Sequence, residues 1–369
     1  MKIYWLFLIL SLFICFVCNR KYKLVDINGY AEPRAYSWQA IIFFSVVIFF
    51  CGLRSGTADT GTYINMFSQW PSNINQIDWT STFNDKGFLF LTVLYKQFIS
   101  NDFHGWLFII TLISSLAIMR AFLNYSADFG MSCFLFIATT IFTYLINGMR
   151  QFIVVALMLN CIDYILNKKF LQYTISVFLL STIHMSAIIL LPFFFIYKIK
   201  PWSKSMWFIV LFLCCIGVFF NRLTFIFEVL MKDSQYEGYL DLLSNGTGTS
   251  IFRLLISLVP CIISFFGRKY IRSVNSPIIN ISIIMSIITS SLYFVALFTN
   301  GMVIGRILIY FEVYNLILLP WLLNNCYEEK SSRLMRFCCI VAYIVFFYIQ
   351  MSITWNISYI SDILGLYLY

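Results

Sequence analysis

The sequence predicts an all-α polytopic membrane protein, and three observations support that fold class. Apolar side chains make up 61% of the 369 residues, and aromatic ones make up 20%. Charged residues make up only 11%, against roughly 25% in soluble domains. The apolar residues gather into a dozen runs, many of them close to the length of a helix that crosses a bilayer. We therefore expect about 12 transmembrane helices in a single integral membrane domain, residues 1–369.

Each expected helix follows from one apolar run. The first, residues 3–18, is followed by "NRKYK" and by no small-residue cleavage site, so we expect it to remain as a spanning helix. The further expected spans are 37–53, 105–123, 131–147, 151–166, 170–183, 186–198, 205–220, 251–266, 277–299, 306–323 and 336–355. Segment 87–99 is short and carries Lys96, which favours an interfacial or re-entrant helix over a span.

Basic residues indicate which side of the membrane each loop occupies. With 87–99 as a non-spanning helix, sixteen of the 25 Lys and Arg residues fall on one side, mostly in short loops such as "KIKPWSK" and "GRKYIR". The positive-inside rule makes that side cytoplasmic, and it places both termini outside. We attribute the +9 net charge to these membrane-flanking loops and expect no nucleic-acid partner. Segments 54–104 and 221–250 are then expected on the outer side of the membrane.

The eleven cysteines give no sign of a metal or redox site. Nearly all lie inside apolar runs, and Cys15 and Cys18 form the one C-x-x-C pair, without a second pair or a histidine nearby. Buried cysteines of this kind act as small hydrophobic residues. The sequence therefore predicts neither a metal nor another cofactor.

Several polar residues flank apolar runs on the predicted outer side. The stretch "GLRSGTADTGTY" carries Arg54, Asp59 and Tyr63, and "NGMRQF" carries Asn147, Arg150 and Gln151; His184, Arg306 and Glu312 lie in later motifs. Arg150 and Arg306 are predicted at helix N-termini, where a cation is unfavourable by about 0.3–1 kcal/mol unless an anion binds there. Each residue alone also fits a structural role, such as an interfacial anchor, an Arg54–Asp59 ion pair or a packing group. Their shared side favours a binding site.

The ordered motifs resemble a known family. "GLRSGTADTGTY", "DKGFLFLTVLYKQF", "NGMRQFIVVAL", "STIHMSAIILLP" and "RILIYFEVYNLILLPW" run from about residue 50 to 320, and together they resemble the EpsG-like and Wzy-type polymerases of bacterial surface polysaccharides (O-antigen, capsule and exopolysaccharide). The resemblance implies a location in a bacterial inner membrane, an architecture similar to GT-C glycosyltransferases and a metal-independent enzyme. Its substrate would be an oligosaccharide repeat unit linked to undecaprenyl diphosphate, and a chain-length regulator protein is an expected partner.

The implied reaction assigns roles to the outer residues. Transfer of the growing glycan to the non-reducing end of a new unit releases a diphosphate, which arginine binds bidentately. We assign Arg150 and Arg306 to the diphosphate and Arg54 to the diphosphate or a sugar, with Tyr63, Asn147, Gln151 and Glu312 as further binding residues. Asp59 and His184 are alternative bases for the acceptor hydroxyl, with Asp59 slightly favoured. Trp70, Trp79, Phe83, Tyr236 and Tyr239 either stack on sugars or anchor the protein at the interface.

Three other functions fit the same composition. A ligase that moves finished glycan to another acceptor is closest in mechanism. A flippase or transporter for lipid-linked oligosaccharide would need charges at mid-membrane, often in repeated halves, and the sequence shows neither. A membrane O-acyltransferase would need a central histidine, a role that His184 leaves open.

Overall fold

A computed structural model describes residues 2–20, 23–27, 30–81, 83–219, 248–299 and 301–368. These ranges hold sixteen α-helices, which confirms a helical protein. The chain divides into two compact units, one formed by residues 1–194 and 339–369 and the other by residues 195–338. Most of the predicted segment 221–250, including Tyr236 and Tyr239, lies outside the described residues.

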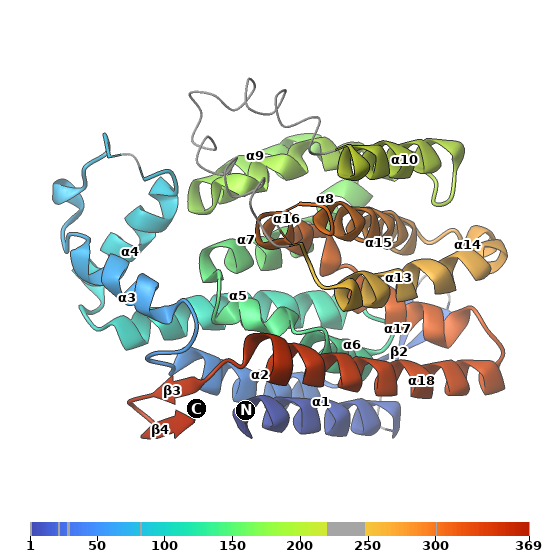
Figure 1. The fold of residues 1–369 in the computed structure, drawn as a ribbon, viewed down its shortest axis with the longest axis horizontal. Coiled ribbons are helices and arrows are strands. Elements are labelled where there is room, and N and C mark those ends of the chain that lie inside the picture. The colour runs from blue at the N-terminus through green and yellow to red at the C-terminus, as the bar shows by residue number, and fades with distance from the viewer. Residues whose placement is uncertain are drawn as a thin grey trace. The chain divides into compact units, whose positions relative to one another are not determined.

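The first unit is a group of packed helices. Its helices are α1 (Lys2–Arg20), α2 (Ser37–Gly52), α3 (Thr60–Gln69), α4 (Lys86–Phe98), α5 (Phe103–Tyr125), α6 (Phe129–Ala138), α7 (Met149–Asn160), α8 (Ile162–Leu166) and α9 (Phe170–Ile183), with 3-10 turns at Ile74–Gln76 and Ile141–Leu145. Helix α5 packs between α2 and α7, and α1 packs against α6 and α2 (Figure 1). Helix α4 packs against α9, and this contact builds the candidate site.

The second unit surrounds one central helix. It holds α10 (Lys204–Val218), α13 (Ile251–Phe266), α14 (Arg268–Val274), α15 (Pro277–Ala296), α16 (Gly301–Glu312) and α17 (Asn315–Asn325). Helix α15 packs against α10, α13, α16 and α17, and most of its side chains are buried. The 3-10 helix Met185–Lys198 and helix α18 (Glu329–Tyr348), followed by a π-helical segment Ile349–Trp355, each run from one unit into the other.

Polar side chains determine where several helices begin. The carboxylate of Asp102 accepts hydrogen bonds from the backbone N–H groups of His104 and Gly105 at the start of α5, and Asp128 accepts one from Met131 in α6. Ser203 and Ser250 cap α10 and α13 in the same way. Such caps satisfy N–H groups that have no partner inside the helix, each contributing about 1 kcal/mol.

Every predicted span contains helix, but the helices are more broken than the apolar runs indicate. Four described helical segments are long and apolar enough to cross a membrane: Phe103–Tyr125, Met149–Leu166, Pro277–Ala296 and Glu329–Trp355. Two bent pairs raise the number to six; α13 and α14 meet at 71°, and α16 and α17 at 46°. This is a multi-pass membrane protein with four to six such spans, and the count of 12 and the sidedness stay predictions.

Four short strands accompany the helices of this all-α protein. Strands β1 (Lys23–Ile27) and β2 (Tyr30–Arg34) pair antiparallel, with Lys23 opposite Arg34. Strands β3 (Tyr359–Ser361) and β4 (Leu366–Leu368) form a second hairpin, with Tyr359 opposite Leu368. Such short hairpins follow apolar runs without a clear alternating pattern, which is why the sequence did not indicate them.

The hairpin β3–β4 is bonded to the loop that follows α2. Ser55 N donates to Ile360 O at 2.8 Å, and Ile360 N donates to Thr57 Oγ1 at 3.0 Å. The hydroxyl of Ser361 donates to Leu53 O. Loop 53–59, which holds two of the predicted site residues, is therefore fixed by a segment about 300 residues away in the chain.

Helix α4 lies where the sequence predicts a non-spanning helix. Its Lys96 is buried, and Nζ donates to the carbonyl oxygens of Phe67 at 2.9 Å and Trp70 at the end of α3. A cation at a helix C-terminus is stabilised by the helix dipole. Burial lowers the pKa of this ammonium group. Lys96 thus joins α4 to α3, which explains a charge inside an apolar run.

Candidate functional site

The candidate site is centred on Asp85, the residue just before α4. Arg150 Nη1 lies 2.8 Å from Asp85 Oδ2, and His184 Nδ1 lies 3.1 Å from the same oxygen. The backbone N–H of Met185 donates to Oδ1 at 3.0 Å. The Asp85 side chain is only 8% exposed. One buried carboxylate therefore holds an arginine from α7 and a histidine from the end of α9.

Two glycines allow the three elements to meet. A Cβ on Gly87 would lie 2.8 Å from Thr182 Cβ, so the first turn of α4 approaches the last turn of α9 more closely than any side chain permits. Gly148 has φ +76°, a left-handed conformation that suits glycine, and it begins α7 two residues before Arg150. The close approach places Asp85 beside His184, and the turn aims Arg150 at Asp85.

Aromatic rings surround the guanidinium of Arg150. Its Cζ lies 5.8 Å from the ring centroid of Tyr63, 5.3 Å from Phe83 and 5.9 Å from Phe88. Cations at this distance are attracted to ring faces, by about 0.5–1 kcal/mol where the pair is exposed. These rings and Asp85 restrict the guanidinium to one position, and its side chain remains 24% exposed. Phe83, predicted as a stacking residue, thus contacts Arg150.

Helix α3 connects Asp59 to the candidate site through Tyr63, whose ring contacts Arg150. Asp59 precedes the first residue of α3, and Tyr63 lies one turn later, so the two share a helix face. The Asp59 side chain is half-buried and makes no capping hydrogen bond. No ion pair joins Asp59 to Arg54 among the described residues. The predicted alternative of an Arg54–Asp59 pair is therefore wrong for this structure.

Arg54 is buried inside the first unit, where it contacts Met149, the residue before Arg150. It is completely buried, and it donates to Thr60 Oγ1 at 2.9 Å, Thr111 Oγ1 at 3.3 Å, Met149 Sδ at 3.2 Å and Cys51 O. Burial lowers the pKa of the guanidinium to about 10, so it stays charged at neutral pH. The structure thus gives Arg54 several protein partners, and its binding to a diphosphate or sugar stays a prediction.

The remaining predicted residues divide between the units. In the first unit Asn147 is exposed just before α7, whereas Gln151 is buried within that helix. In the second unit Glu312 accepts a hydrogen bond from Tyr293 Oη at 3.0 Å. Arg306 is exposed in the second turn of α16, which begins at Gly301. The predicted helix N-terminal position of Arg306 is therefore wrong, whereas Arg150, the second residue of α7, does occupy such a position.

Asp85 is the residue that the sequence did not identify. It lies inside the motif "DKGFLFLTVLYKQF", directly before a glycine-containing helix start, and this was the available signal. The sequence indicated that Arg150 at a helix N-terminus needs an anion. The structure supplies that anion from the protein itself, since Asp85 occupies one edge of the guanidinium.

Replacing Gly87 by alanine is expected to damage the site through packing. The added methyl group collides with Thr182 and forces α4 away from α9, which separates Asp85 from His184. Overpacking of this kind costs about 1–3 kcal/mol. Thermal unfolding of purified protein in detergent measures it, with Gly61→Ala as the control, because nothing lies within 4 Å of a Cβ at Gly61. Equal melting temperatures for both variants would contradict the close contact.

Comparison with known proteins adds one finding. A family model described as the EpsG family matches residues 37–361, a range that includes every residue of the candidate site. No curated protein and no solved structure matches the chain.

Proposed function

The chain belongs to the EpsG family, which is associated with exopolysaccharide biosynthesis, and from this we propose that it is a polysaccharide polymerase. The proposed substrates are two oligosaccharide repeat units linked to undecaprenyl diphosphate. The growing glycan leaves one lipid diphosphate and is joined to the non-reducing end of the other unit. The observation that supports this most directly is the arginine and histidine held by one buried carboxylate, Asp85.

Arg150 is the proposed diphosphate ligand. A guanidinium has five N–H donors, and the described protein partner Asp85 takes one of them on Nη1. The side chain is partly exposed and is held by aromatic rings, so its remaining terminal donors are oriented before substrate binds. Preorganised donors of this kind stabilise the negative charge that develops on a departing diphosphate. Arg306 stays a prediction from the sequence for the same role.

His184 is the proposed base. Its Nδ1 faces Asp85, and no hydrogen bond to its Nε2 is found among the described residues. A carboxylate that accepts from Nδ1–H fixes the imidazole so that Nε2 carries the lone pair. This geometry favours His184 over Asp59, which was slightly preferred from the sequence. Asp59 remains the alternative base, one helical turn from Tyr63.

The proposed step conserves atoms and charge. The acceptor hydroxyl oxygen forms a bond to the anomeric carbon of the growing glycan while the bond from that carbon to the diphosphate oxygen breaks. The hydroxyl proton moves to His184 Nε2, and the diphosphate keeps the electron pair and stays on its lipid. Arg150 binds this leaving group, and Asp85 stabilises the protonated imidazole.

Substitution of His184 tests the proposal. In polymerisation of purified lipid-linked repeat units, His184→Gln is expected to slow chain growth roughly a hundredfold or more, because it removes a general base. The control is His104→Gln, since His104 contacts Asp102 and Ser55 and lies outside the site. Unchanged rates for His184→Gln together with a large loss for Asp59→Asn would transfer the base role to Asp59. Addition of a chelator is expected to leave the wild-type rate unchanged.

A further inference from the structure

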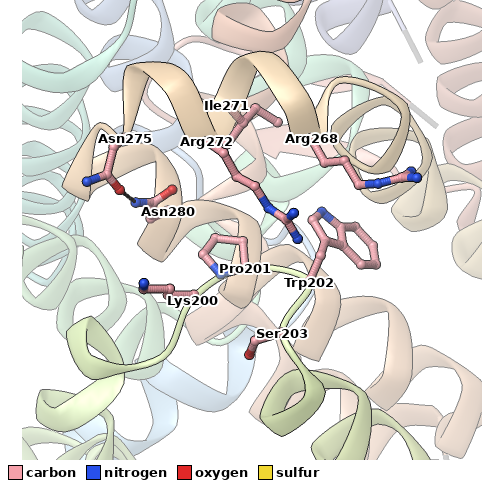
Figure 2. A pocket seen from close by; sticks show the side chains of 9 residues that line it. All are labelled: Lys200, Pro201, Trp202, Ser203, Arg268, Ile271, Arg272, Asn275 and Asn280. Atoms are coloured by element: carbon pink, nitrogen blue, oxygen red, sulfur yellow. Dashed lines mark hydrogen bonds between the residues drawn. The ribbon is translucent and has the colours of Figure 1, made fainter.

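A cavity lies wholly within the second unit. It has a volume of about 440 Å³, and its lining includes Lys200, Trp202, Arg268, Arg272, Asn275 and Asn280 (Figure 2). These residues come from the turn before α10, from helix α14 and the turn after it, and from the first turns of α15. Cavities of this volume are typical of small-molecule sites.

The cavity has three positive charges and no negative one. Its three cations are Lys200, Arg268 and Arg272, and no carboxylate lines it. Among the described residues, none of the three makes an ion pair. Arg268 is held in place by the end of the preceding helix, α13, since its Nη1 donates to Phe265 O at 3.0 Å and its Cζ lies 4.2 Å from the Phe265 ring centroid. Like charges gathered without a counter-ion repel one another, so an anion stabilises this arrangement.

The indole of Trp202 adds a hydrogen-bond donor without an acceptor. Its Nε1 is buried and has no hydrogen-bond partner. Figure 2 shows the guanidinium of Arg272 and this nitrogen directed toward each other, although both are donors. An acceptor placed between them would satisfy both. Trp202 also has φ +55°, an uncommon backbone conformation for a residue other than glycine, and such conformations gather at ligand sites.

The composition and the orientation of helix α14 indicate that the cavity lies at a membrane surface. Helix α14, "RKYIRSV", is strongly basic, and it turns by 71° from the apolar helix α13. The loops "KIKPWSK" and "GRKYIR" are those that the positive-inside rule predicts to be cytoplasmic. Basic side chains at that surface attract anionic headgroups, each by about 1 kcal/mol.

We propose that this cavity binds a phosphate group at the cytoplasmic membrane surface, with Arg268, Arg272 and Lys200 as its charged ligands and Trp202 Nε1 as a neutral donor. Guanidinium groups suit phosphate because they present paired donors. The volume of about 440 Å³ admits the group attached to the phosphate as well, as in the headgroup of an anionic phospholipid. None of the residues that line this cavity belongs to the Asp85 site.

Lipid retention by the full-length protein tests the proposal. Purified protein in a neutral detergent is titrated with phosphatidylglycerol, and bound lipid is counted by native mass spectrometry. Arg272→Gln is expected to weaken retention about tenfold, the effect of one lost charge-assisted hydrogen bond. Lys269→Gln is the matched control, because it removes one charge from the same short helix outside the cavity lining. Trp202→Phe keeps an aromatic ring, though a smaller one, and removes the indole N–H, and it is expected to weaken retention severalfold.

A parallel titration with inorganic phosphate distinguishes the two sources of the group. Displacement of phosphatidylglycerol by inorganic phosphate, abolished by Arg272→Gln, identifies free phosphate as a ligand; retention of lipid in excess phosphate identifies the headgroup. Equal retention by the wild type, Arg272→Gln and Lys269→Gln would overturn the proposal, as would failure of both probes to bind. Melting temperatures of the three variants separate lost binding from lost folding, and Arg272 is exposed enough that no change is expected.

Discussion

Asp85→Asn is expected to reduce polymer formation by roughly a hundredfold or more while the protein still accumulates in the membrane. Asparagine has the same shape and still accepts the hydrogen bond from Met185 N, so the junction of α4 and α9 survives. The negative charge is lost. Arg150 then has no counter-ion on Nη1, and His184 has no anion to orient its imidazole or stabilise its protonated form. The measurement is polymer length from purified lipid-linked units, beside the protein level in membranes.

Asp78→Asn provides the matched control for Asp85. Asp78 lies in the same segment before α4, but its carboxylate is exposed and accepts hydrogen bonds from its neighbours in the chain, chiefly Thr80. Its substitution is expected to leave polymerisation unchanged. Wild-type polymer lengths with Asp85→Asn would show that the Asp85 cluster is not part of the catalytic machinery. Loss of the protein itself would instead assign Asp85 a folding role alone.

Arg54→Ala is expected to destabilise the protein by about 2–4 kcal/mol, through loss of hydrogen bonds and creation of a cavity. The completely buried guanidinium joins the end of α2, the start of α3, helix α5 and helix α7 through its hydrogen bonds. Alanine leaves these acceptors facing an empty space. The expected result is a lower melting temperature in detergent and less protein in the membrane, with polymer reduced in proportion to the protein.

The contrast with Arg150→Ala makes this result informative. Arg150 is partly exposed and contacts the candidate site, so its loss is expected to stop polymerisation without a proportional loss of protein. Arg54→Ala with wild-type stability and no polymer would mean that Arg54 contacts substrate, as the sequence predicted. The two arginines thus separate a residue that supports the site from one that forms it.

Apolar runs predicted the helices well because their signal is local. All twelve predicted segments contain helix, and α9, α10 and α13 begin and end within two residues of the predicted bounds. The breaks were harder to predict. The turn at Val313 and Tyr314, which divides α16 from α17, lies within the single apolar run 306–323. Such breaks depend on packing between helices, which the apolar character of a single segment does not reveal.

The candidate site was predicted in part for the same reason. Arg150 and His184 were identified because their charge or imidazole interrupts an apolar run, and the structure brings these two together. Asp85 lies in a polar segment among Asn84, Lys86 and Asp78, where one more acid gives no contrast. Its importance depends on the close approach of Gly87 to Thr182, which is a property of two helices and not of one.

The bonds between loop 53–59 and hairpin β3–β4 have a consequence for biogenesis. Thr57 and its hydrogen-bond partner Ile360 are 303 residues apart in the chain. Because ribosomes add about 5–20 residues per second, about 15–60 s pass between the synthesis of the two residues. During that interval the backbone of the loop is satisfied by other groups or by water. Insertion of the early helices therefore precedes completion of this loop, and nascent chains arrested before residue 359 are expected to carry it in a protease-sensitive state.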